Sequence, residues 1–535
     1  MSPTSLDARR PWLAPLEIAF LSAVVVAWAL LVIGLGKDMS WDFRNYHWYV
    51  PYAFLNGRMG FDVSVAHQAT YYNPFLDIPF YLLASHTHSW FALGVMGAVQ
   101  GLNIVPVYVI ARAVLNLPEK ILVAAILSLF CVTGSLNVGL IGATYYDNVM
   151  SVLVLSGLAS VVLNRELLRA GTIASIALVS GLVGLVVGSA VGLKLPEAPF
   201  ALGIAAALFV IPGSPARRIT RLLACAAGGI AGVALFAGYW ILKMYHDTGN
   251  PLFPYFNQYF RSPLALHASY RDIRFVPHRL TKRLLFPILF SLDWHVADDL
   301  PFQDIRIGTA YVLGIATAPF ALFKRSRDPI VDPGAAAILF AFGAVSYLAW
   351  LLMFGIYRYI ITLEILAPLL IVSAVGLWPV TRYARLVTLG VLAVLVLTTT
   401  RYDFLDHAPL GDPYIQADIP AIRDPNHSLV LMTGEAPMGF MVPLLPHRVP
   451  VLRIDGWMIQ PEDGSRLTAE TRARVTAFKG DLFVITDEYE VGRAGAALAD
   501  YGLGMRWTEC EVFTSNLGGQ YRFCPLKRIP GKPAT

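Results

Sequence analysis

A short polar run whose residue types could do chemistry lies directly after the first long apolar segment. Residues 40–52 contain the carboxylate of Asp42, the guanidinium of Arg44, the imidazole of His47 and several aromatic rings. In a helix, side chains spaced i, i+3, i+4 and i+7 share one face. That spacing groups Asp42, Asn45, Tyr46 and Tyr49. We therefore expect a carboxylate that can accept a proton, beside groups that bind a polar substrate.

A second polar and aromatic cluster, residues 68–77, closes the same loop. The substrate-binding residues that we predict come from both clusters: Tyr46, His47, Tyr72 and Asn73. Two further acids of this loop, Asp62 and Asp77, are predicted to close turns or cap helices rather than to react.

Three cations are predicted to bind a phosphate: Arg358, Lys194 and Arg44. Arg358 stands at the start of an apolar helix, where its donor fork and the helix N-terminus both favour an anion. The alternative for this arginine is to extend toward lipid head groups. The alternative for Lys194 is an ion pair with Glu197, three residues later.

The sequence has no Cys-x-x-Cys pair, no His-x-x-x-His pair and no glycine-rich phosphate loop. We therefore predict no cofactor, and a divalent metal is not indicated. Carboxylates and cations fit the transfer of a group from a phosphate-linked donor. A carboxylate takes a proton from an acceptor hydroxyl, and the cations stabilise the leaving phosphate.

The composition is that of a protein with many membrane spans. Of its 535 residues, 56% are hydrophobic and only 14% are charged, whereas soluble domains are about 25% charged. The formal net charge of +5 requires no nucleic-acid partner. We expect membrane lipids to surround most of the chain.

Eleven apolar runs, the first near residues 12–36 and the last near 386–400, predict eleven transmembrane helices. The short loops assigned to the cytoplasm each carry two or more basic residues, as residues 215–221 do. This alternation places the N-terminus, with Arg9 and Arg10, in the cytoplasm and the C-terminal region outside it. The basic loop 244–306 is assigned to the outside, because long loops translocate largely regardless of charge.

The pattern changes after residue 400 and predicts a small α/β domain over residues 401–535. Short β-type runs at 428–432, 449–454 and 481–486 alternate with helix-like stretches at 466–478 and 490–502. The membrane part then comprises residues 1–400.

The four cysteines fall into two pairs. Cys131 and Cys225 lie in apolar runs, where we expect small buried side chains. Cys510 and Cys524 lie in strand-like runs of the C-terminal region. We predict a disulfide between them, because that region is assigned to the outside of the cytoplasm.

The run at residues 41–47, together with Ala53 and residues 56–58, resembles the acidic motif of the GT-C superfamily of multi-spanning glycosyltransferases. The layout of eleven spans with an outer soluble domain is similar too. The likeness covers about the first 400 residues. Within the superfamily, the chain is similar to the transferases that use lipid-linked mannose or aminoarabinose. It implies an enzyme that moves a hexose or pentose in the inner (plasma) membrane of a bacterium, as part of building the cell envelope.

The resemblance also implies partners and roles. The donor is a sugar linked to polyprenyl phosphate, the acceptor is a glycan or lipid at the outer face, Asp42 is the base, and Arg358 lies near the phosphate. Many members have two adjacent acids in this motif, whereas here Phe43 follows Asp42. Asp147, which follows two tyrosines, is our candidate for the second catalytic acid.

Two other functions remain open at this point. A lipid-linked glycan polymerase or ligase would use arginines rather than a carboxylate. A transporter or flippase for a lipid-linked substrate would have paired half-helices and acids inside its spans, for which Glu364 is one acid near a span end.

Overall fold

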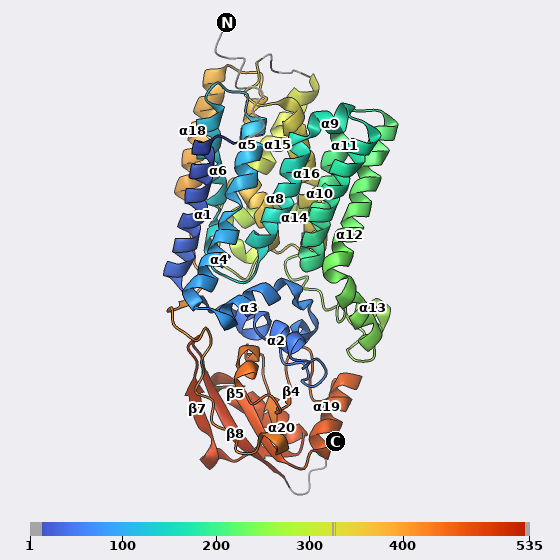
Figure 1. Cartoon of the computed structure of the whole chain (residues 1–535), viewed down its shortest axis with the longest axis vertical. Helices are drawn as coiled ribbons and strands as arrows, with labels where there is room; N and C mark the ends of the chain where they lie inside the picture. The colour runs from blue at the N-terminus through green and yellow to red at the C-terminus, as the bar shows by residue number, and fades with distance from the viewer. Residues whose placement is uncertain (1–12, 324–325, 327, 530–535) are drawn as a thin grey trace.

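A computed structural model describes residues 13–323, 326 and 328–529. Arg9 and Arg10, which carry the prediction for the N-terminus, lie outside the described residues. The molecule is elongated, with a helical bundle at one end and the C-terminal sheet domain at the other (Figure 1). A layer formed by residues 37–86 lies between them. We call the end of the bundle that meets this layer the sheet end; it is the end predicted to be outer.

Each predicted span coincides with a helix or a pair of helices. In chain order these are α1 (Pro15–Leu35), α4 (Ser89–Gly101) with α5 (Ile104–Val114), α6 (Lys120–Val132), α8 (Asp147–Leu163), α10 (Ile173–Leu193), α11 (Ala198–Val210), α12 (Pro215–Thr248), α15 (Arg306–Phe323), α16 (Pro333–Met353), α17 (Ile361–Gly376) and α18 (Arg382–Thr399). Short helices join them: α7 (Ser135–Gly139), α9 (Arg165–Ala170), α13 (Asn257–Phe260) and α14 (Leu280–Leu292).

Within the described residues, seven helical segments are long and apolar enough to cross a membrane. They are α1, α4 with α5, α10, α12, α16, α17 with the preceding turn, and α18. The helices α6, α8 and α11 have 13, 17 and 13 residues, fewer than the about 20 that a span needs. The count of eleven spans therefore stays a prediction.

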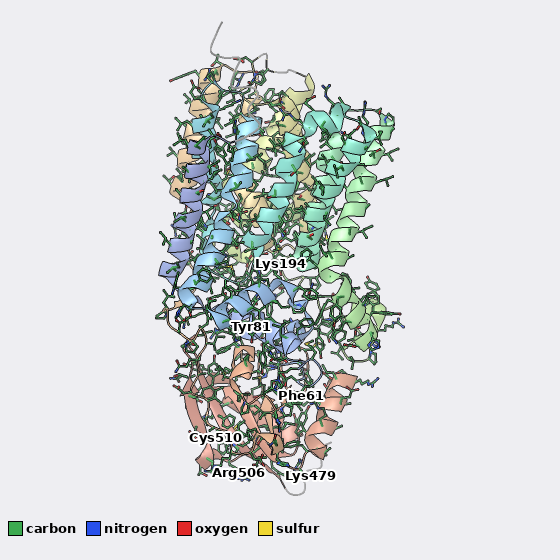
Figure 2. The ribbon with its side chains drawn as sticks, viewed as in Figure 1. Phe61, Tyr81, Lys194, Lys479, Arg506 and Cys510 are labelled. Atoms are coloured by element: carbon green, nitrogen blue, oxygen red, sulfur yellow. A yellow bond between two sulfur atoms is a disulfide. The ribbon has the colours of Figure 1, made fainter. Side chains whose placement is uncertain are left out.

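Helices α10 and α12 approach until their backbones touch at glycines. A Cβ atom on Gly188 would lie 2.2 Å from the carbonyl oxygen of Gly229. Small residues spaced four apart allow such contact between helices in an apolar environment. The packing holds the end of α10, and Lys194 directly after it, at the sheet end of the bundle (Figure 2).

The layer contains β1 (Lys37–Asp38), the π-helical turn η3 (Phe43–His47), α2 (Tyr49–Leu55), the 3₁₀ turns η4 (His67–Tyr71) and η5 (Pro74–Leu76), and α3 (Ile78–His86). The π-helical turn breaks the predicted shared face. Tyr46 donates to Asp42, but Asn45 donates to the carbonyl of Ala66 and Tyr49 donates to Asp62. The expected alignment of these side chains was wrong because the run is not a regular α-helix.

The C-terminal domain is a mixed sheet with helices. Its elements are β3 (Ser428–Met432), β4 (Val451–Arg453), α19 (Arg466–Ala477), β5 (Asp481–Asp487), α20 (Val491–Asp500), β6 (Leu503–Met505), β7 (Glu511–Thr514) and β8 (Gln520–Arg528). The strand order is β4-β3-β5-β8-β6, with β7 beside β8; β4, β3 and β5 are parallel, and β8 is antiparallel to β5. The α/β character agrees with the sequence. The strand-like run predicted around Cys524 is β8, whereas β6 was not predicted as a strand.

The cysteines lie as their surroundings suggested. Cys510 and Cys524 form a disulfide, and Cys131 and Cys225 are buried free thiols. Cys524 lies in β8, but Cys510 precedes β7 and is not in a strand. One further strand, β2 (His407–Ala408), pairs with β1 and ties the link after α18 to the layer.

A buried ion pair joins the layer to the sheet domain. The guanidinium of Arg58 binds the carboxylate of Asp62 at 2.6 Å, and also donates to the carbonyls of His447 and Val449. Asp62 in turn accepts a hydrogen bond from the backbone N–H of Val451 at 2.9 Å. The layer and the sheet domain are therefore packed as one unit.

We expect Arg58→Ala to lower the free energy of unfolding by about 3–5 kcal/mol, because it leaves the buried carboxylate of Asp62 without its cation. Thermal or denaturant unfolding of the full chain in detergent measures this loss. The control is Arg466→Ala, which removes an exposed pair with Glu470 and should cost less than about 1 kcal/mol. Equal losses of unfolding free energy in the two variants would contradict a stabilising role for the buried Arg58–Asp62 pair.

Candidate functional site

Asp42 lies half-buried at the start of the π-helical turn. The hydroxyl of Tyr46 donates to its carboxylate at 3.1 Å. Burial, and then the negative charge of Asp42, raise the pKa of Tyr46 well above its ordinary value, so the phenol keeps its proton and remains a donor. Among the described residues, no lysine, arginine or histidine nitrogen is paired with the Asp42 carboxylate. Asp42 can therefore accept a proton or face a substrate.

Arg358 lies in the 3₁₀ turn η8 (Tyr357–Ile360), directly before α17. Its backbone N–H donates to Asp298 at 2.8 Å, and its guanidinium lies 3.7 Å from the same carboxylate. The guanidinium also lies over the rings of Tyr145 and Tyr359, at 5.0 and 5.2 Å from their centroids. The contact with Asp298 is loose enough to leave the outer donors of Arg358 for an anion.

Lys194 supplies a second cation from the end of α10. Its ammonium group forms a short ion pair with Asp147 and donates to the carbonyl of Tyr145 at 2.6 Å. It lies 5.5 Å from the ring centroid of Tyr359. The pair with Asp147 replaces the alternative pairing with Glu197. One oxygen of Asp147 is buried without a hydrogen-bond partner among the residues that the structure describes.

Tyr145 connects the carboxylate and the cations. After burial, the Asp42 carboxylate raises the pKa of Tyr145, and the Arg358 guanidinium lowers it. Both charges therefore act on the same buried phenol. The structure thus brings four predicted residues together around Tyr145 and Tyr359: Asp42, Asp147, Lys194 and Arg358.

His47 forms a buried pair with Asp77. The ring Nδ1 lies 2.6 Å from the carboxylate, and the ring packs edge-on against Tyr146. Burial raises the pKa of Asp77, and the charge of His47 opposes this effect. Asp77 stands at the start of α3, as a cap would, but its side chain binds His47 rather than the helix. The Nε2 atom of His47 is buried without a hydrogen-bond partner.

Tyr72 reaches the site together with Tyr255, which was not among the predicted site residues. Its hydroxyl lies 2.5 Å from that of Tyr255, the two rings stack, and its ring lies edge-on to Tyr46 at 5.4 Å. Tyr255 belongs to a segment after α12 that is rich in proline and aromatic residues. That composition is the signal that could have identified it.

Asn73 plays a structural part. Its amide donates to the carbonyls of Gly192 and Phe236, at 3.1 and 2.8 Å, and accepts a hydrogen bond from Phe75. These contacts fix the layer to the end of α10 and to α12. They occupy the side chain that we predicted to bind substrate.

Arg44 does not join the other cations. Burial raises the pKa of Tyr521 and of Asp487, and the guanidinium of Arg44 opposes both shifts; both residues belong to the sheet domain. We predicted Arg44 beside the donor phosphate. The structure places it elsewhere, because the π-helical turn directs this side chain toward the sheet. The neighbour of Arg358 is therefore the acid Asp298 and not the arginine Arg44. Asp298 was not predicted as a site residue, and its signal in the sequence is the adjacent acid Asp299.

Two apolar cavities lie in the bundle. One of about 860 Å³ lies among α10, α11 and α12, and one of about 1120 Å³ lies among α14, α15, α16 and α17. The second reaches from Arg283 to Leu377. Glu364, the acid considered for transport, accepts hydrogen bonds from the backbone N–H groups of Leu136 and Asn137 at the start of α7. In the described part of the chain, no three His, Cys, Asp or Glu side chains are grouped as metal ligands would be.

Known proteins offer one structural likeness and no match in sequence. No protein-family model matches the sequence, and no curated protein matches it. The chain is similar in structure to the oligosaccharyltransferase of Archaeoglobus fulgidus, crystallised in the apo form, with 13% sequence identity and a TM-score of 0.46 over 90% of this chain and 71% of that one. A functional assignment therefore depends on the arrangement of the side chains.

We expect Asn73→Ala to lower the free energy of unfolding by about 1–3 kcal/mol, because it leaves buried carbonyls without their donor. Thermal unfolding in detergent measures the change. Asn56→Ala is the matched control, since that amide makes one bond to the carbonyl of Tyr52 and should cost less. A normal melting temperature for Asn73→Ala would contradict the structural role, and the prediction that Asn73 binds substrate would stand.

Proposed function

We propose that this protein is a membrane glycosyltransferase that moves a sugar from a polyprenyl-phosphate donor to an acceptor hydroxyl at the sheet end of the bundle. One observation carries the proposal. Asp42, a carboxylate without a cationic partner in the described structure, acts electrostatically on the same buried phenol, Tyr145, over whose ring the guanidinium of Arg358 lies at 5.0 Å. A base and a cation beside one phenol suit an acceptor hydroxyl and a leaving phosphate.

The reaction divides among these groups as follows. Asp42 takes the proton of the acceptor hydroxyl as the oxygen forms a bond to the anomeric carbon of the donor sugar. The bond from that carbon to the phosphate oxygen breaks, and its electron pair leaves with the phosphate. Arg358 and Lys194 stabilise the negative charge that develops there. Tyr46 keeps the Asp42 carboxylate oriented through its hydrogen bond.

Asp147 has a supporting part in this scheme. Its pair with Lys194 holds the ammonium group beside Tyr359 and Arg358. Its remaining buried oxygen has no hydrogen-bond partner and can accept one from a sugar hydroxyl. The His47 and Asp77 pair lies on the neighbouring side and supports the ring of Tyr46, 4.0 Å from that of His47.

The lipid part of the donor needs apolar surface next to the cations. The 1120 Å³ cavity offers it, because its lining includes Leu351 of α16 and Leu363 of α17, which lie on either side of the turn that carries Arg358. An isoprenoid chain in this cavity would hold its phosphate at the sheet end of the bundle. The donor would then approach from the bundle, and the acceptor from the sheet domain.

Asp42→Asn should lower the rate of sugar transfer by about 10²- to 10⁴-fold, because it removes the base and keeps the shape of the side chain. The assay uses the full chain in lipid vesicles, with a panel of polyprenyl-phosphate hexoses and pentoses carrying a radioactive sugar. Transfer to the glycan and lipid fractions of the vesicles is counted. Asp424→Asn, an exposed carboxylate in the sheet domain, is the control and should be fully active.

Arg358→Ala should lower transfer by about 10²-fold or more, because the leaving phosphate loses its main cation. Arg506→Ala, an exposed arginine at the far end of the sheet domain (Figure 2), is the matched control. Full transfer by Asp42→Asn with loss only in Arg358→Ala would favour the polymerase or ligase mechanism. Full transfer by both variants, at normal melting temperature, would falsify the proposed site.

A further inference from the structure

An aromatic contact joins the layer to the sheet domain beside the proposed base. The indole of Trp457, in the loop after β4, stacks on that of Trp41 with centroids 4.8 Å apart and planes 21° from parallel. The buried ring of His67 lies against both, at 5.2 Å from Trp457 and 6.1 Å from Trp41. Trp457 nevertheless stays 48% exposed. The stack is thus accessible from one side.

Polar groups border the exposed indole. Arg493 binds the carboxylate of Glu435 at 2.7 Å and that of Asp455 at 2.5 Å. Arg493, and after it the indole N–H of Trp457, lower the pKa of Glu435, so this carboxylate is ionised at neutral pH. We call these five residues the tryptophan patch: Trp41, Trp457, Glu435, Asp455 and Arg493.

The patch lies where ligands commonly bind in α/β domains. Glu435 follows β3 and Asp455 follows β4, and these two strands are parallel. The carboxyl ends of parallel strands form the usual ligand-binding edge of an open sheet. Here that edge faces the layer, since Trp41 contacts Trp457 from the other side.

Two more polar atoms nearby lack partners. The side-chain oxygen of Gln68, the residue after His67, is buried without a hydrogen-bond partner in the described structure. The Nε of Arg44, three residues after Trp41, is in the same condition. Unpaired buried polar atoms are costly unless a ligand or water satisfies them. Both residues lie within three positions of a stacked ring in the sequence, and their unpaired atoms favour a polar ligand in this region.

We infer that the tryptophan patch binds the acceptor as a chain of pyranose sugars, an inference that rests on the proposed glycosyltransferase function. A pyranose ring presents an apolar C–H face and a rim of hydroxyl groups. The exposed indole of Trp457 covers the face, and the carboxylates and guanidinium of the patch bind the hydroxyls with charge-assisted hydrogen bonds.

The position of the patch assigns it to the acceptor rather than to the donor. Trp41 turns to the sheet domain, whereas its neighbour Asp42 turns to Tyr46 and the bundle. The cations for the donor phosphate lie on the bundle side of Asp42. A glycan held on Trp457 would reach the base from the opposite side, with its terminal hydroxyl toward Asp42.

Transfer kinetics test the assignment. Trp457→Ala should raise the KM for the acceptor glycan by about tenfold, the loss expected for one aromatic stacking contact. The kcat at saturating acceptor and the slow hydrolysis of the donor by water should change little. Trp457→Phe should retain most of the affinity. Trp507→Ala, which removes a tryptophan that is 57% exposed elsewhere in the sheet domain, should match the parent protein. An unchanged acceptor KM in Trp457→Ala would overturn the inference.

Binding tests it without any transfer reaction. Saturation-transfer NMR is measured on the full chain in nanodiscs, with chitotetraose or maltotetraose at about 1 mM. It should show contacts between the protein and the ring protons of the sugars. The signal should persist in Asp42→Asn and Trp507→Ala, fall in Trp457→Ala, and weaken in Glu435→Gln, which keeps the indole stack. No signal in the parent protein, or equal signals in all variants, would refute the patch. Normal glycan binding without transfer from any donor would instead refute the proposed function alone.

Discussion

The structure depends on how charged groups are neutralised in the layer between the helical bundle and the sheet domain. A buried ion left alone is costly, whereas a paired one is tolerated. Four ion pairs neutralise charges in the layer and beside it: Arg58 with Asp62, His47 with Asp77, Lys194 with Asp147, and Arg358 with Asp298. Asp42 differs from these four acids, since among the described residues its carboxylate accepts only the hydroxyl of Tyr46. For that reason we propose Asp42, rather than these paired acids, as the base.

The same pairing makes the site rigid. Asn73 attaches the layer to α10 and α12, and Arg58 attaches it to the sheet domain. Within the bundle, Asp304 binds Arg306 at 2.7 Å, and Glu364 caps the short helix α7. The side chains around Tyr145 are thus held by elements far apart in the chain. Preorganised charges of this kind need little rearrangement during a reaction.

Much of the architecture could be predicted because it depends on local patterns. Apolar runs located the helices, although the bounds of α6 and α12 were wrong by seven to nine residues, and alternating β-type and helical runs located β3, β5, α19 and α20. The strand β6 was not predicted, because its three residues are too few for a periodic signal. The site was anticipated in part: Asp42, Asp147, Lys194 and Arg358 do gather, although their roles are proposals.

The sequence alone determined which segments are apolar enough for a membrane, where the chain changes to an α/β domain, and that a carboxylate, Asp42, follows the first long helix. Only the tertiary structure decided which charge meets which. The π-helical turn sends Arg44 to the sheet and leaves Asp42 with Tyr46, Asp298 from a distant loop holds Arg358, and Tyr255 reaches Tyr72. The physical reason is that periodicity is a property of neighbouring residues, whereas ion pairs and stacked rings form between segments that only the packed fold brings together.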